Sequence, residues 1–172
     1  VLYQDGNMRT NGKWHFTKYD QHSRPVLTGF CTGTEASHQQ ALESQTTFHE
    51  SFEFKELPIL GIDWGPLFGY TCNSYPQISN SHEYLTIIYY DNYDWNFFDT
   101  HPFYTNFSLG EDHVRRPTGN ITGIKERVLV NHSSLGKWLT TTHYYNSENR
   151  QVQTVRDLYP VGIEITAFKY NY

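Results

Sequence analysis

Along residues 13–30, hydrophobic and polar positions alternate, stop at a polar segment, and then alternate again. Trp14, Phe16 and Lys18 fall on one face of the first run, because successive side chains of an extended strand point to opposite faces. The polar segment 20–24 is rich in turn-forming residues, and the second run opens with a proline, which a strand tolerates at its first position. The pattern therefore predicts an antiparallel hairpin.

The same alternation recurs elsewhere in the chain. Residues 137–155 repeat it most closely, a weaker copy covers about 84–95, and 163–172 has the pattern of a copy that is cut off. Repeated hairpins are typical of arrays in which each unit buries one face against its neighbour. The expected fold class is therefore mainly β, with repeated antiparallel hairpins joined into a sheet.

One segment, about 34–45, has the features of a short helical insert. Thr34 or Ser37 can serve as its N-cap, and Ala41 and Leu42 belong to a thin apolar stripe. The other linking segments are irregular or rich in Gly and Pro, and they predict loops with short strands.

The copies share their residue types at fixed places. A Trp opens the first strand, Tyr followed by Asp or Asn ends it, and Arg starts the return. Asp and Asn at a turn accept hydrogen bonds from backbone N–H groups two residues on, and an Arg across the turn can pair with that carboxylate and stack on a Tyr ring. We interpret the Trp residues of the two best copies as equivalent positions that pack between neighbouring hairpins. The predicted repeat-signature residues are Trp14, Tyr19, Asp20, Arg24, Tyr90, Asp91, Trp138, Tyr145, Asn146 and Arg150.

Two of these segments, FTKYDQHSRPVLTG and THYYNSENRQVQTV, resemble the YD repeats of RHS (rearrangement hotspot) proteins. Further segments, QDGNMRTNGKW, GYTCNSYP, YLTIIYYDNYDW and TGNITGIKERVL, resemble the RHS-repeat surface proteins of Bacteroidota in particular. The resemblance covers most of the chain apart from the helical insert and the stretch near 100–117. Asn146 and Asn171 depart from the family's Asp, and Ser23 and Asn149 stand where many repeats have Gly.

The resemblance implies that the hairpins wind into a β-sheet ribbon, which in the RHS family closes into a hollow shell around a C-terminal cargo such as a toxin. It also implies export to the cell surface or beyond. We therefore interpret 1–172 as an internal piece of a YD-repeat array and expect a non-catalytic structural role, enclosing or presenting a C-terminal module. The expected partners are neighbouring repeats of the same parent chain, an enclosed cargo, or further copies joined through strand edges.

Composition agrees with a sheet protein and argues against two other classes. Aromatic residues make up 17% of the chain, including 14 Tyr, and they suit the half-buried surface of a sheet. We expect the Tyr side chains to place the ring inward and the hydroxyl outward. A net charge of -5 gives no indication of nucleic-acid binding, and no apolar run reaches the length of a membrane span. Nothing at the start of this sequence has the pattern of a signal peptide.

The sequence contains no clear motif for a metal site or a catalytic site. The nine His residues form no ligand pair with the spacing of a helix or a zinc finger, so no metal or other cofactor is expected. Asp91, Asp94 and Asp99 cluster near aromatic residues, as the two carboxylates of a glycosidase do, but an aromatic-lined turn has the same pattern. We expect no catalytic residues and no enzyme activity. Cys31 and Cys72 can form one disulfide or stay as two thiols, and the pattern favours thiols.

An alternative function is recognition at the cell surface. Trp64 and Trp95 lie outside the repeated positions, and their ring faces could contact a glycan or a protein. This alternative requires both rings to be exposed on the outside of the fold. A shell wall requires them to be sequestered.

Overall fold

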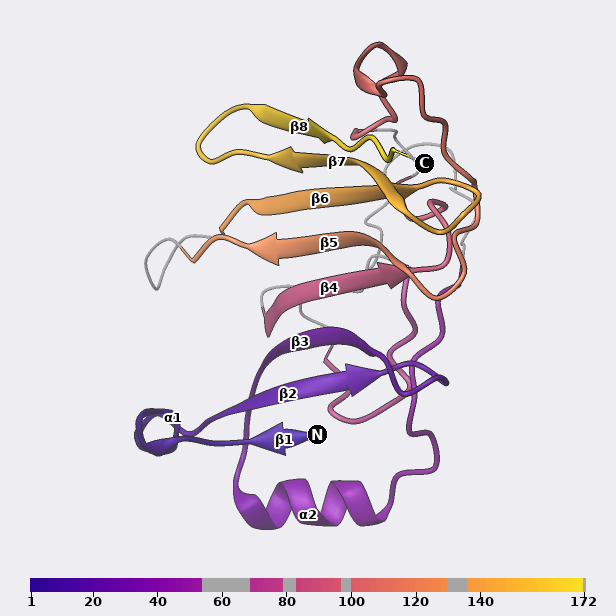
Figure 1. The fold of residues 1–172 in the computed structure, drawn as a ribbon. Coiled ribbons are helices and arrows are strands. Elements are labelled where there is room, and N and C mark those ends of the chain that lie inside the picture. Colours follow the sequence, from indigo (N-terminus) through magenta and orange to yellow (C-terminus); the bar gives the residue numbers. More distant parts are fainter. Residues whose placement is uncertain (54–68, 79–82, 97–99, 130–135, 172) are drawn as a thin grey trace, which may run out of the picture. The chain divides into compact units, whose positions relative to one another are not determined.

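The computed structural model is mainly β, and its described residues form eight antiparallel strands in the order of the sequence and two short α-helices (Figure 1). The predicted fold class of repeated antiparallel hairpins with a short helical insert is confirmed. The chain forms two compact units, Val1–Ile87 and Ile88–Tyr172, and each is described by itself. The residues described are 1–53, 69–78, 83–96, 100–129 and 136–171.

Unit 1 contains the first predicted hairpin. Its two strands are antiparallel, with Phe16 opposite Gly29, and a β-bulge interrupts the register between Lys18 and Tyr19. Apolar side chains from both strands and from the strand beside them form the core, and Phe16 is fully buried there. The elements are β1 (Leu2–Tyr3), α1 (Gly6–Thr10), β2 (Lys13–Tyr19), β3 (Pro25–Thr32), α2 (Glu35–Glu43) and the start of β4 (Tyr84–Tyr90).

The predicted helical insert is present as α2. Thr34 is the N-cap, and its hydroxyl accepts a hydrogen bond from the backbone N–H of Ser37, while the Ser37 hydroxyl accepts from the backbone N–H of Thr34. This reciprocal capping box satisfies two backbone donors that the helix itself leaves without partners. Both residues considered as caps therefore contribute to the start of the helix.

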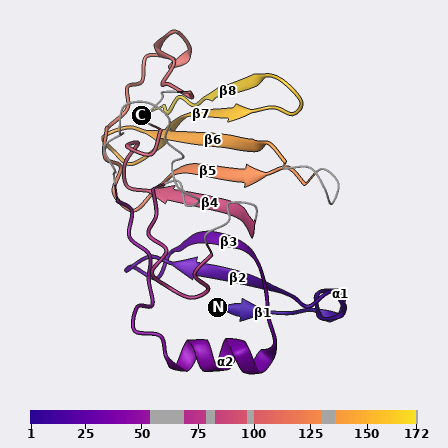
Figure 2. The ribbon, with the colours of Figure 1, turned by 180° about the vertical axis from the view of Figure 1, so that it is seen from behind.

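The packing of α2 differs from the prediction. Its buried residue is His38, and Leu42 is exposed, so the predicted apolar stripe does not hold the helix. The His38 ring lies edge-on to Trp14 at 4.9 Å, and its Nδ1 is 2.6 Å from the Tyr75 hydroxyl. Both views of the ribbon show α2 next to β1 (Figures 1 and 2). The His38 ring, with its contacts to Trp14 and Tyr75, therefore positions α2 in place of the predicted apolar stripe.

Unit 2 contains the second predicted hairpin, formed by β6 and β7. A β-bulge between Tyr144 and Tyr145 interrupts the register, at the place where β2 also has its bulge. β8 pairs with β7, so the truncated copy is a strand added to the same hairpin. The elements are β5 (Ile121–Arg127), β6 (Trp138–Tyr145), β7 (Gln151–Asp157), β8 (Ile163–Ala167) and the 3₁₀ turn η2 (Thr105–Phe107).

The predicted hairpin over 84–95 is wrong in its return strand. β4 ends at Tyr90, and residues 91–95 form bends and turns. The backbone N–H of Asp91 instead donates to the Asn120 carbonyl at 3.1 Å, and Asp91 Oδ1 accepts from Gly119 N at 2.6 Å. The turn is therefore closed by residues that directly precede β5, and a long segment is inserted between its two ends.

This inserted segment folds back onto the β6–β7 hairpin. The buried amide of Gln153 accepts from Tyr104 N at 2.8 Å and donates to Tyr104 O at 3.1 Å. The Tyr144 hydroxyl donates to the His101 carbonyl, and Val114 N donates to Tyr145 O at 2.8 Å. Attachments at several separate points therefore fix the inserted segment against the hairpin.

Candidate functional site

The first YD-type turn is built by the Asp20 side chain. The backbone N–H of Asp20 donates to Arg24 O at 3.0 Å, which closes the turn. Asp20 Oδ1 accepts hydrogen bonds from His22 N and Arg24 N, both at 2.9 Å. Ser23 has a φ of 60°, in the left-handed region that favours Gly.

The second turn repeats these bonds around Asn146. The backbone N–H of Asn146 donates to Arg150 O at 2.9 Å, and Asn146 Oδ1 accepts from Glu148 N at 3.2 Å and Arg150 N at 3.0 Å. Asn149 has a φ of 64° and matches Ser23. Asn replaces Asp without loss of this geometry, because the turn requires only one side-chain oxygen as acceptor.

The Arg residues of the two turns have different partners. Arg24 pairs with Asp20 Oδ2 at 2.7 Å, as predicted. Asn146 carries no charge, and Arg150 pairs instead with Glu148 at 3.0 Å and lies over the Tyr170 ring at 5.1 Å. The predicted pairing of Arg with the turn carboxylate is therefore confirmed in the first copy, and the second copy, with Asn at this place, has a different ion pair.

Replacing Asp20 by Ala is expected to lower the free energy of unfolding by about 1–2 kcal/mol, because two backbone donors and Arg24 lose their acceptor. Asp20→Asn keeps the Oδ1 bonds and loses only a part-exposed ion pair, so a loss below about 1 kcal/mol is expected. Urea denaturation of the three proteins measures both differences. Equal losses for the two variants would show that the ion pair, and not the turn, is the main contribution.

Each hairpin also binds a distant segment at the same position. Tyr19 O accepts from Glu50 N at 2.8 Å, and Tyr145 O accepts from Val114 N at 2.8 Å. Both carbonyls lie at the β-bulge before the turn, where the ladder register shifts. The residue directly before each Tyr is buried and reaches into the same distant segment: Lys18 contacts Glu50, and Tyr144 contacts His101.

Lys18 and Glu50 form a buried ion pair. Both side chains are inaccessible to solvent, and Lys18 Nζ lies 2.9 Å from Glu50 Oε1 and 3.0 Å from the Ser74 carbonyl that accepts its second hydrogen bond. Buried charges of this kind are tolerated only when they are paired and hydrogen-bonded. The pair therefore joins β2 to two segments that follow α2.

The Glu50 carboxylate is fully engaged by neighbouring donors. Oε1 accepts from the backbone N–H of Ser74 at 3.1 Å and from its hydroxyl at 2.6 Å. Oε2 accepts from the Thr71 hydroxyl at 2.7 Å and from Asn73 N at 3.0 Å. Such a closed set of bonds leaves no position for a substrate, so the network is structural.

The two Trp residues that open the repeats are not equivalent in register. Trp14 precedes the turn Tyr by five residues and Trp138 precedes it by seven, so Thr140 is the counterpart of Trp14. Trp14 Nε1 donates to Gly33 O at 3.0 Å, whereas the Trp138 ring lies 4.9 Å from the Arg127 guanidinium. The interpretation of these residues as equivalent packing positions is therefore wrong.

Trp95, proposed from the sequence as a ligand-facing ring, is buried. Its side chain is stacked on Tyr89 with centroids 4.6 Å apart, and its Nε1 donates to the Thr122 hydroxyl at 3.1 Å. The exposed Trp95 ring that the recognition alternative requires is therefore absent, because the segment after β4 turns this ring back against the sheet. Trp64 lies outside the described residues.

Gly123 leaves the space that the Trp95 ring occupies. A Cβ atom at this position would lie 2.0 Å from Trp95 Cζ2. Gly123→Ala is expected to lower the free energy of unfolding by about 1–3 kcal/mol, because overpacking displaces a buried ring. Thermal unfolding checks this, with Gly6→Ala as the control, since nothing lies within 4 Å of a Cβ there. Equal stability of both variants would contradict the close contact.

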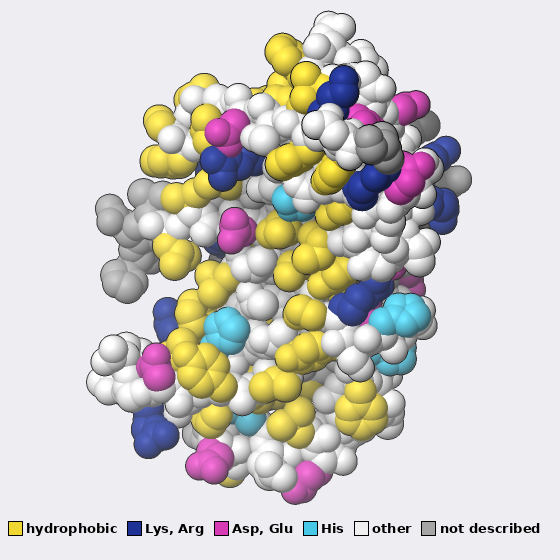
Figure 3. Space-filling model, in the orientation of Figure 1, with side chains coloured by type: hydrophobic (Ala, Val, Ile, Leu, Met, Phe, Trp, Pro, Cys, Tyr) yellow, Lys and Arg dark blue, Asp and Glu magenta, His cyan; other side chains and the backbone are white. Residues whose placement is uncertain are grey.

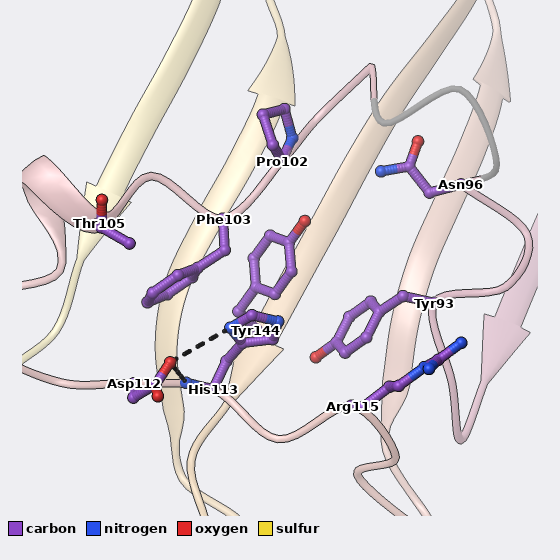
Figure 4. Close-up of a pocket in the computed structure, with 9 residues that line it drawn as sticks. All are labelled: Tyr93, Asn96, Pro102, Phe103, Thr105, Asp112, His113, Arg115 and Tyr144. Carbon is purple, nitrogen blue, oxygen red and sulfur yellow. Dashed lines mark hydrogen bonds and ion pairs between the residues drawn. The ribbon is translucent and has the colours of Figure 1, made fainter.

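An aromatic cavity of about 620 Å³ opens in unit 2 (Figure 4). Tyr93 stacks on Tyr144 with ring centroids 4.8 Å apart, and the Phe103 ring lies 4.5 Å from that of His113. Tyr144 comes from β6, and the other residues come from the segment inserted between β4 and β5. The cavity is lined by Tyr93, Asn96, Pro102, Phe103, Thr105, Asp112, His113, Arg115 and Tyr144.

The acidic cluster suggested by the sequence is divided among different partners. Asp91 contacts Gly119 at the closure of the β4 turn, and Asp94 lies 3.8 Å from Arg115 and 3.6 Å from Arg116. Asp99 lies outside the described residues. Within the described ranges, no group of three His, Cys, Asp or Glu side chains is placed to hold a metal ion.

Cys31 and Cys72 are both thiols, as the sequence favoured. Burial, together with the charge of Glu83, raises the pKa of Cys31 to about 11, so this thiol stays protonated near neutral pH. The Cys72 thiol donates to Ile78 O at 3.4 Å.

The surface has a mixed character. On the face drawn in Figure 3, Lys and Arg side chains lie near Asp and Glu side chains, and hydrophobic groups are interspersed with polar ones. The described side chains on this face therefore form no continuous basic patch of the kind that nucleic acid binds. In the parts of the chain that are described, no helix has the length and apolar character needed to cross a membrane.

Comparisons with known proteins give no relative for this chain. No protein-family model matches it, and neither the curated proteins nor the solved structures contain a match.

Sequence reasoning missed the buried ion pair and the cavity. One signal for the ion pair was present, since Lys18 falls on the same strand face as Phe16. Glu50 carries no such signal, because its partners lie in other segments. The cavity residues Tyr93 and Phe103 lie in an irregular stretch without periodicity, and only the fold brings them to Tyr144.

Proposed function

We propose that this chain is a non-catalytic structural segment of an exported shell or scaffold of the YD-repeat type, whose parent protein encloses or presents a C-terminal module. The observation that carries the proposal is the repeated turn. Asp20 and Asn146 make the same side-chain and backbone hydrogen bonds, with a residue of positive φ at the same place. Two separate hairpins with the same turn and the same bulge are typical of a repeated structural unit.

The proposed partners are neighbouring repeats, and the last strand supports this. β8 is at one end of the strand order, and apolar side chains are exposed beside it, among them Val161 (87%) and Ile163 (46%). An exposed strand edge is a template for further pairing. The isolated chain is therefore expected to self-associate at high concentration, and light scattering over a concentration series measures this. A constant monomer mass at all concentrations would contradict the expectation.

Limited proteolysis of the native parent protein, with mass spectrometry of the surviving fragments, tests the shell function. Enclosure predicts that the C-terminal module survives for as long as the repeat region is intact. Denaturing the repeat region first should expose the module to digestion. If the C-terminal module is digested freely while this segment persists, the enclosing shell is wrong. A scaffold that presents the module without enclosing it would then be the function to test.

A further inference from the structure

The aromatic cavity of unit 2 has rings whose orientation is fixed. The Tyr93 hydroxyl donates to His143 O at 3.0 Å, and the Tyr144 hydroxyl donates to His101 O. Burial raises the pKa of Tyr93, so its hydroxyl remains a donor at neutral pH. Because both hydroxyls are engaged with the backbone, the rings cannot swing away. Tyr144 itself is buried, and the partly buried Tyr93 and Phe103 pack against it as preorganised walls of the cavity.

Polar side chains border these rings on two sides. In Figure 4, Asn96 lies on one side of the Tyr93, Phe103 and Tyr144 rings. Asp112 and Arg115 lie on the other side. The side chains of Asp112 and Arg115 are 93% and 84% exposed, so they can turn toward a ligand at little cost. They supply donors and acceptors of opposite charge, and the border has no excess of either sign.

We propose that this cavity binds a neutral sugar residue of a glycan, with its C–H face on the partly exposed Phe103 ring and its hydroxyls bonded to Asn96, Asp112 and Arg115. A pyranose ring has an apolar face and a rim of hydroxyls that both donate and accept, which fits an aromatic floor with polar groups on opposite sides. A volume of about 620 Å³ lies in the range of sites for small ligands and accommodates one or two such rings.

Organic cations fit the cavity less well. An aromatic cage for an alkylammonium group requires rings that surround an open space. Here Tyr93 and Tyr144 stack on each other, and Phe103 contacts both His113 and Tyr144. These rings pack against one another and do not surround an open space from all sides, and the Arg115 guanidinium adds a repulsive charge.

The inference does not depend on the shell function, since a structural repeat can carry a binding site on an inserted segment. A glycan array probed with the full 172-residue chain, followed by calorimetric titration with the strongest neutral glycan, tests it. We expect binding that Phe103→Ala weakens by about tenfold, since a stacked ring contributes about that much affinity. Asp112→Ala and Arg115→Ala should each weaken it several-fold without loss of folding, because both side chains are exposed.

The matched control is Phe107→Ala, which removes an exposed ring of the same insertion that does not line the cavity. Its affinity should equal that of the unchanged protein. Absence of any neutral glycan on the array would overturn the proposal, as would binding that all three cavity variants leave unchanged. Loss of binding by Phe107→Ala alone would place the site elsewhere. Binding restricted to acidic glycans would also overturn the assignment of a neutral sugar.

Discussion

Glu50→Ala should lower the free energy of unfolding by about 3–5 kcal/mol, the range expected when one partner of a buried ion pair is removed. The variant leaves the Lys18 ammonium inside the protein without its carboxylate, beside the Ser74 carbonyl at 3.0 Å and the Cys72 sulfur at 3.8 Å. It also removes the acceptor of the Ser74 hydroxyl and of two backbone N–H groups. Denaturant unfolding monitored by circular dichroism measures the loss.

A double-mutant cycle separates the ion pair from the rest of the network. Adding Lys18→Met to Glu50→Ala should cost little more, because the unpaired buried charge is then removed. Glu43→Ala is the control, since that carboxylate lies on the exposed side of α2 and its loss should stay within about 0.5 kcal/mol. If the losses from Lys18→Met and Glu50→Ala simply add, the two side chains are not coupled, and the ion pair does not stabilise the fold as a unit.

The same carboxylate predicts an acid-sensitive contribution to stability. Burial by itself raises the pKa of Glu50, but hydrogen bonds from Ser74 and Thr71 and the charge of Lys18 outweigh it, and the pKa lies below its usual value of 4.5. A carboxyl whose pKa is lowered by folding stabilises the protein above its unfolded pKa, and this contribution is lost as the pH falls through the folded pKa. The unfolding free energy should therefore fall below about pH 4.5, and fall less steeply in Glu50→Ala.

Gln153→Met should lower the free energy of unfolding by about 2–4 kcal/mol. The side chain is fully buried, and its amide bonds both backbone groups of Tyr104. Met fills a similar volume without these bonds, so one N–H and one C=O lose their partners, at about 1–3 kcal/mol each where water cannot replace them. Hydrogen exchange should show faster exchange across residues 100–119 in particular.

Gln151→Met is the matched control on the same strand. Gln151 bonds only the Thr154 hydroxyl through its side chain, at 2.7 Å, and is partly exposed, so its loss should be small. A uniform increase in exchange across the whole of unit 2 in Gln153→Met would show that Gln153 supports the sheet in general and does not clamp the insertion.

The turns could be predicted from sequence because every residue that builds them is local. Asp20 and Asn146 satisfy donors within four residues, so the pattern that identifies the turn also contains its partners. The alternation of 13–19 likewise places Lys18 on the inner face of its strand. These features follow from backbone periodicity and short-range hydrogen bonding alone.

The remaining structure depends on partners that are distant in the chain. Glu50 lies 32 residues from Lys18, and Gln153 lies 49 residues from Tyr104, so neither pair leaves a local signal. Tyr hydroxyls expected to face water instead donate to backbone carbonyls, as Tyr145 does to Ile121 O at 3.0 Å. The amino-acid composition indicates that many Tyr rings help to form the sheet surface. Which backbone carbonyl accepts a hydrogen bond from each Tyr hydroxyl depends on the tertiary structure.

The hydrogen bond between Asp91 and Asn120 closes the connection from β4 to β5, so this connection can hold a long inserted segment. This loop is about seven times as long as the loop between Asp20 and Arg24, which corresponds to about three doublings of length. The extra chain entropy lost on closing the longer loop costs only about 2 kcal/mol. Strand register on either side is set by the ladder and not by the loop. A hairpin array of this design can therefore acquire, lose or exchange whole inserted segments at its turns without a change in the sheet itself.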